Sequence, residues 1–150
     1  MPSWLAWSGL AAIRRWTSLP ILLKGILTAE DARLAVEHGV GGIVVSSHGA
    51  RQLDRTVTTA DALEEIVTAV GDRTELWVDG GIRRGLDVVT AVALGARGVL
   101  VGRPILWALA AAGEPGVARA LEILRVETVL AMTLRGTPTA GDITRAHVAS

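Results

Sequence analysis

The most polar segment of the chain places a histidine and an arginine three positions apart. It runs from Ser46 to Asp54 and contains His48 and Arg51. A histidine can act as a general base near neutral pH, and an arginine can hold a carboxylate through two parallel hydrogen bonds. This pairing indicates a site for acid–base chemistry on a carboxylate. In the alternative interpretation the segment is a polar loop in which Arg51 pairs with Asp54.

Two glycine-rich segments could hold an anion. The first contains Asp79, Gly80, Gly81 and Arg83, and the second reads Gly102-Arg103-Pro104. Adjacent glycines let backbone N–H groups approach an anion closely, and each segment runs into the N-terminus of a predicted helix. The two arginines add positive charge. The two segments together predict a phosphate site.

A lysine interrupts another apolar run. Lys24 ends the run that begins at Ile21, and Gly25 follows it. Two interpretations stay open at this point. The side chain either extends along an apolar rim with its charge in water, or it is a fixed cation that faces a ligand.

Four short, nearly continuous apolar runs predict strands that are buried on both faces of a parallel sheet. The runs are Ile21–Lys24, Gly42–Ser46, Leu76–Asp79 and Gly98–Val101. Helical patterns lie before, between and after them, at Leu10–Trp16, Thr28–His38, Thr59–Val70, Arg84–Leu94, Pro104–Ala112 and Gly116–Leu134, with a last short helix near Thr139–Asp142. Strict alternation of strands and helices implies parallel strands joined by right-handed crossovers.

An internal repeat gives more detail about this architecture. At an offset of 56 positions, the segment from Gly25 to Val45 matches the segment from Gly81 to Val101 at many of its glycine, aspartate and apolar positions. Two similar βαβ units fit part of a (β/α)8 barrel. A flavodoxin-like open sheet with helices on both faces is the alternative, and the topology alone does not separate the two.

The composition excludes several classes of function. The 150 residues have zero net charge, half of them are hydrophobic, and there is no cysteine. We therefore expect one domain over residues 1–150, with no basic surface for nucleic acid and no thiolate chemistry. No apolar stretch reaches the roughly 20 residues of a membrane span, and no metal site is predicted. The first 16 residues lack an early positive cluster, so we expect a cytoplasmic protein without a signal peptide.

Four segments of the chain resemble one enzyme family. They are Leu19–Gly25, Ser46–Asp54, Asp79–Gly85 and Gly102–Pro104. Together they look like the FMN-dependent 2-hydroxy-acid dehydrogenases and oxidases, which include glycolate oxidase, lactate oxidase, mandelate dehydrogenase and flavocytochrome b2. The resemblance extends from Pro2 to His147. It implies an α/β fold, namely the C-terminal half of a (β/α)8 TIM barrel, with FMN as the cofactor.

The resemblance also implies a role for each site residue. His48 would be the catalytic base, taking a proton from the 2-position of the substrate or from its hydroxyl, and Arg51 would bind the substrate carboxylate. Lys24 would lie near the flavin N1 and C2 carbonyl, and Ser46 would contact the flavin ring. The implied cofactor-binding residues are Lys24, Ser46, His48, Gly49, Asp79, Gly80, Gly81, Arg83, Gly102 and Arg103.

The sequence departs from the family pattern in two respects. Many members have asparagine where this chain has Ser47, and the four strands that open the family's barrel are missing, together with every tyrosine. We therefore expect oxidation of a 2-hydroxy acid to a 2-oxo acid, but an isolated chain that is inactive. A second copy of the chain, or a separately encoded N-terminal half, would complete the barrel. The alternative is an FMN- or phosphate-binding half-barrel without this chemistry, for which the pair His48 and Arg51 is not required.

Overall fold

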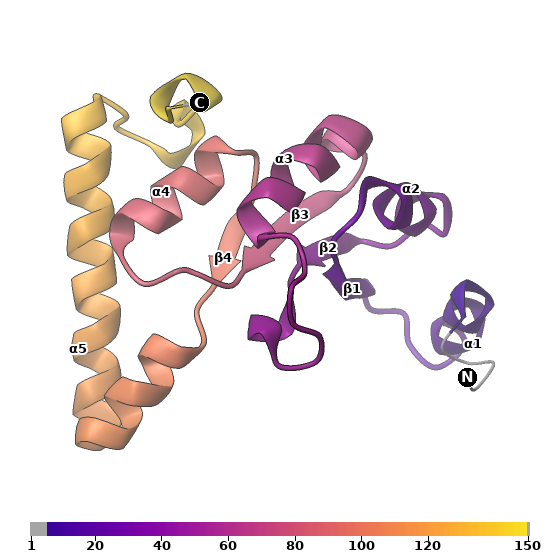
Figure 1. Cartoon of the computed structure of the whole chain (residues 1–150), viewed down its shortest axis with the longest axis horizontal. Coiled ribbons are helices and arrows are strands. Elements are labelled where there is room, and N and C mark those ends of the chain that lie inside the picture. The colour runs from indigo at the N-terminus through magenta and orange to yellow at the C-terminus, as the bar shows by residue number, and fades with distance from the viewer. Residues whose placement is uncertain (1–5, 150) are drawn as a thin grey trace.

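The computed structural model describes residues 6–149 as a four-stranded parallel sheet with helices (Figure 1). The start of the resemblance at Pro2 lies outside the described residues. The strands are β1 (Leu22–Ile26), β2 (Gly42–Val45), β3 (Glu75–Asp79) and β4 (Gly98–Leu100). All four predicted strands are confirmed, with ends that differ by one or two residues.

The order of the strands decides between the two architectures. Each strand pairs in parallel with the next one in sequence, which gives the order β1-β2-β3-β4. A flavodoxin-like sheet reverses its order at a switch point, and no reversal occurs in the described sheet. The sequential order is that of a (β/α) barrel, so the predicted half-barrel fold is confirmed.

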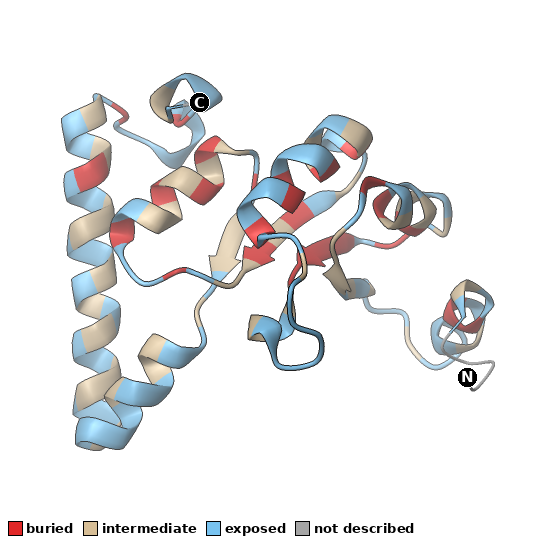
Figure 2. Ribbon diagram, in the orientation of Figure 1, coloured by how far each residue is buried: buried red, intermediate tan, exposed pale blue. Residues whose placement is uncertain are grey.

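The two faces of the sheet differ in what covers them. Three helices, α2 (Ala29–Glu37), α3 (Thr59–Val70) and α4 (Gly85–Ala93), supply buried residues to a core that also contains Ile43, Val45, Leu76 and Val78 (Figure 2). The alternate strand residues, which point to the other face, include Leu22 and Leu100, with 46% and 40% of their surface exposed. In a closed barrel this second face is the interior.

The helices before and between the strands begin and end within two residues of the predicted positions. A short helix, α1 (Leu10–Arg14), precedes the sheet, and α2 is capped by Thr28, whose Oγ1 accepts a hydrogen bond from the Asp31 N–H at 3.2 Å. Gly39, with φ at +66°, follows His38, the residue that caps the end of α2. An L-residue adopts this conformation only at a cost, which is why glycine stops the helix there.

The last long helix is two helices in succession. α5 (Arg103–Arg135) has non-helical backbone angles at Ala112 and Gly113, which confirms the break predicted between the two apolar patterns. Within residues 6–149, no helix is both long and apolar enough to cross a membrane. The predicted final helix is instead a single 3₁₀ turn at Ala140–Asp142, because Ile143 already returns to extended backbone.

The sheet has two open edges. Among residues 6–149, β1 and β4 each pair with one neighbouring strand. An unpaired edge presents free N–H and C=O groups that favour pairing with a further strand. Both edges of the described sheet therefore leave N–H and C=O groups available for pairing.

Candidate functional site

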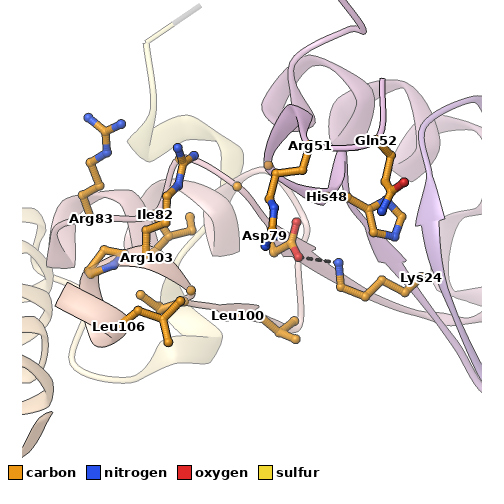
Figure 3. A pocket seen from close by; sticks show the side chains of 16 residues that line it. Lys24, His48, Arg51, Gln52, Asp79, Ile82, Arg83, Leu100, Arg103 and Leu106 are labelled. Carbon is orange, nitrogen blue, oxygen red and sulfur yellow. Dashed lines mark ion pairs between the residues drawn. The ribbon is translucent and has the colours of Figure 1, made fainter. Parts of the chain in front are cut away.

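A cavity of about 510 Å³ lies at the carboxyl ends of the strands (Figure 3). Every predicted site residue except Ser46 lines it: Lys24, His48, Gly49, Arg51, Asp79, Gly80, Gly81, Arg83, Gly102 and Arg103. The lining residues that sequence reasoning did not assign are Gln52, Ile82, Leu100, Val101, Pro104 and Leu106. A volume of this size is typical of cofactor and ligand sites.

Lys24 is held in place by two partners, one directly after β2 and one at the end of β3. Its Nζ lies 2.6 Å from Asp79 Oδ2, at the end of β3 (Figure 3). The same Nζ donates to Ser46 Oγ at 2.6 Å. A lysine that reached for solvent along a rim would not be bound twice. Lys24 is thus a fixed cation in the wall of the cavity.

Ser46 lies behind the cavity wall. It is fully buried, and its Oγ also accepts a hydrogen bond from the His48 backbone N–H at 3.1 Å. A hydroxyl accepts two hydrogen bonds and donates one, so Lys24 and His48 use its acceptor capacity. Because Ser46 does not line the cavity, its contact with a flavin ring stays a prediction.

One carboxylate oxygen at the site has no partner. Asp79 Oδ1 is buried, and none of the residues 6–149 donates a hydrogen bond to it. A buried acceptor left unpaired costs about 1–3 kcal/mol, and such an atom in a native structure points to a missing partner. A hydroxyl group of a bound ligand would supply it.

The segment after β2 folds into a tight turn with unusual backbone angles. His48, Gly49 and Ala50 form a 3₁₀ turn with φ values of +54°, +69° and +59°. Positive φ is uncommon outside glycine, and such strain clusters at functional sites. No ion pair between Arg51 and Asp54 occurs in the described part of the chain, so the structure does not support the polar-loop alternative.

Two arginine side chains lie on one side of the cavity. In Figure 3 Arg83 and Arg103 lie on one side, and Lys24 and His48 on the other. A Cβ placed on Gly49 would lie 3.9 Å from an Arg103 guanidinium nitrogen, so the histidine turn and the start of α5 are neighbours. The side with Arg83 and Arg103 carries two cationic side chains, which suits an anion such as phosphate, and the other side carries Lys24 and His48.

The start of α4 differs from the prediction of an anion-binding helix end. The N–H groups of Arg83 and Arg84 both donate to Asp87 Oδ2 at 2.9 Å, and the Gly85 N–H donates to Glu127 Oε2 at 2.9 Å. These protein carboxylates already occupy the donors that an anion would use. In this segment the groups that remain for an anion are the Gly80–Gly81 backbone and the Arg83 side chain.

A family model, curated relatives and a solved structure all place this chain among FMN-dependent dehydrogenases and oxidases. A family model for FMN-dependent dehydrogenases matches residues 1–150. Glycolate oxidase 1 from Oryza sativa subsp. indica is 55% identical over 96% of this chain, and glycolate oxidase from Spinacia oleracea is 53% identical over 97%. A solved structure of mandelate oxidase with benzoyl-formic acid superposes with a TM-score of 0.90 at 55% identity, over 93% of this chain.

The lengths of these proteins differ. The chain spans 39% and 40% of the two glycolate oxidases and 42% of that mandelate oxidase chain. A mandelate oxidase variant with a monooxide FMN adduct gives the same TM-score, over 45% of its length. Because the family match covers the whole chain, this chain belongs to the FMN-dependent dehydrogenase family.

Proposed function

We propose that this chain binds FMN and carries the base and the carboxylate-binding arginine of an enzyme that oxidises a 2-hydroxy acid to a 2-oxo acid. The observation that carries the proposal is the single cavity that brings His48 and Arg51 beside the Lys24–Asp79 pair. The relatives are named as glycolate, mandelate and (S)-2-hydroxy-acid oxidases, which supports this reaction class.

The residues of the cavity fit the parts of FMN. Arg83, Arg103 and the N–H groups of Gly80 and Gly81 would hold the phosphate, since both glycines have positive φ and turn their backbone toward the cavity. Asp79 Oδ1 would accept a hydrogen bond from a ribityl hydroxyl. The remaining cofactor contacts would come from Lys24, Ser46, His48, Gly49 and Gly102. When bound, FMN would supply the acceptor for the two electrons that leave the substrate.

The protein's part in the reaction is positioning and proton transfer. Arg51 would pair with the substrate carboxylate, and this would fix the neighbouring carbinol carbon between His48 and the cofactor. His48 would take one proton, from the 2-position or from the hydroxyl. Oxidation to the 2-oxo acid removes two protons and two electrons in all. General-base catalysis of this kind contributes typically about 10²–10⁴-fold in rate.

The partner that completes the barrel and the location in the cell are also part of the proposal. Four further strands, from a second copy or from a polypeptide that carries the N-terminal half, would close the sheet at its two open edges. Size-exclusion mass of the 150-residue chain, alone and with such a polypeptide, tests this arrangement. The cytoplasmic location stays a prediction, which cell fractionation would test.

Flavin fluorescence and visible absorbance during FMN titration test the binding step. We expect saturable binding by the assembly that closes the barrel, followed by reduction of the flavin when a 2-hydroxy acid is added. His48→Gln should keep the cofactor and reduce turnover by about 10²-fold or more. His38→Gln is the matched control, because that ring contacts Leu34 O at 2.9 Å, outside the cavity. Binding of FMN without flavin reduction by a 2-hydroxy acid would favour the module without this chemistry, and reduction that is unchanged in His48→Gln would contradict the role of His48 as base.

A further inference from the structure

The residue after Lys24 forms a bulge in the sheet. In the pairing of β1 with β2, Lys24 faces Val44 and Ile26 faces Val45, so Gly25 has no opposite residue. Its φ is +105°, a conformation that L side chains rarely adopt. Bulges of this kind lie next to active sites, where they redirect a side chain.

We propose that Gly25 is a positioning residue for His48, whose imidazole occupies the space that any side chain at residue 25 would fill. A Cβ built on Gly25 would lie 2.6 Å from His48 Cε1 and 3.5 Å from each ring nitrogen. Real Cβ atoms essentially never approach a heavy atom as closely as 2.6 Å. The ring therefore rests directly on the backbone of β1.

The backbone of His48 cannot easily move to relieve such a contact. Its N–H is bound to Ser46 Oγ at 3.1 Å, and Ser46 is fully buried and tied to Lys24. The residue is also already in the left-handed region, with φ at +54°. A side chain at position 25 would therefore displace the imidazole itself, by rotation away from β1.

The effect on catalysis rests on the proposed function. The three atoms nearest to the Cβ position of Gly25 all belong to His48 and none to Arg51, so binding of the substrate carboxylate should be retained in Gly25→Ala. A base displaced by about 1 Å can lower the rate about 10²-fold. We expect kcat to fall by about that factor while KM changes little, which is the pattern of an interaction made in the transition state.

Nuclear magnetic resonance of the histidine Cε1–H groups tests the inference without FMN or turnover. The chain has three histidines, and the His48 signal is the one that disappears in His48→Gln. We expect this signal to shift in Gly25→Ala while the signals of His38 and His147 stay in place. Gly71→Ala is the matched control, because Gly71 also has positive φ (+53°) but no atom within 4 Å of its Cβ position.

A double variant covers the case in which Gly25→Ala folds poorly. Removal of the ring in His48→Ala should relieve the contact, so Gly25→Ala should lower Tm less in that background than in the wild-type chain. Equal losses of Tm in both backgrounds, or an unshifted His48 signal in folded Gly25→Ala, would overturn the inference. Neither the His48 signal nor Tm depends on catalysis. Both measurements therefore test the inference even if the chain does not oxidise 2-hydroxy acids.

Discussion

Two helices of this chain start from glycine- and arginine-containing loops at neighbouring strand ends, yet the two starts do different things. At the start of α4, Gly85 is buried, and its N–H donates to Glu127, a residue of α5. At the start of α5, Gly102 has no atom within 4 Å of its Cβ position, and Arg103 lines the cavity. The start of α4 is thus packed against another helix, and the start of α5 faces the cavity.

The difference follows from which groups satisfy the free N–H donors. The first N–H groups of any α-helix lack partners within the helix. At the start of α4 the carboxylates of Asp87 and Glu127 accept hydrogen bonds from these N–H groups. The first turn of α5 contains no acidic residue that could do the same. Similar sequence patterns thus lead to different roles. Carboxylate side chains from other parts of the chain decide whether the N–H groups at a helix start remain available to an anion.

The largest loss of stability should come from adding one methyl group at the start of α4. A Cβ on Gly85 would lie 2.1 Å from the Thr128 backbone nitrogen in α5, so Gly85→Ala must push the two helices apart. We expect a loss of about 3 kcal/mol in the free energy of unfolding, at the upper end for overpacking. Urea denaturation measures it. Gly102→Ala is the matched control and should cost less than about 1 kcal/mol; equal losses at both glycines would contradict the comparison.

The next effect should appear in cofactor affinity at the α5 start. Arg103→Gln removes one of two cationic side chains at the phosphate end of the cavity. A hydrogen bond to a charged group contributes about 1.5–3 kcal/mol, so FMN should bind about 10- to 100-fold more weakly in a fluorescence titration.

The matched control for that titration is the arginine at the α4 start. Arg84 pairs with Glu127 at 3.2 Å and does not line the cavity, so Arg84→Gln should leave FMN affinity unchanged. If both variants weakened FMN binding equally, the two helix starts would not differ in the way proposed.

Local sequence signals predicted most of the fold. The strand β2 is four apolar or glycine residues ending at the polar segment, and helix ends coincide with glycines such as Gly39, whose conformation other residues avoid. His48 and Arg51 were predicted from residue type and spacing alone. These features depend on neighbours within a few positions, and such information is present in a single sequence.

Features that depend on distant residues could not be predicted in this way. Glu127 lies 42 positions after Gly85, so the residues near Gly85 in the sequence do not indicate that its N–H donates a hydrogen bond to a carboxylate. The burial of Ser46 depends on how the strands pack, and the role of Gly25 on the placement of His48. The one local signal at Gly25 was a glycine that directly follows a lysine at a strand end.

The smallest effect should be a pH-dependent contribution of Glu127 to stability. The hydrogen bond from the Gly85 N–H, and then the Arg84 side chain, lower the pKa of Glu127 below its ordinary value. A carboxylate with a lowered pKa in the folded state stabilises the fold above its unfolded pKa of about 4.3, and this contribution is lost as the pH falls through the folded pKa. Glu127→Gln should therefore lower Tm at pH 7, and the difference in Tm from the wild-type chain should become smaller below about pH 4.

Glu65→Gln, the same charge change at an exposed position of α3, should leave Tm nearly unchanged at every pH. A Tm gap for Glu127→Gln that stayed constant into strong acid would mean that the carboxylate charge does not hold the α4 start.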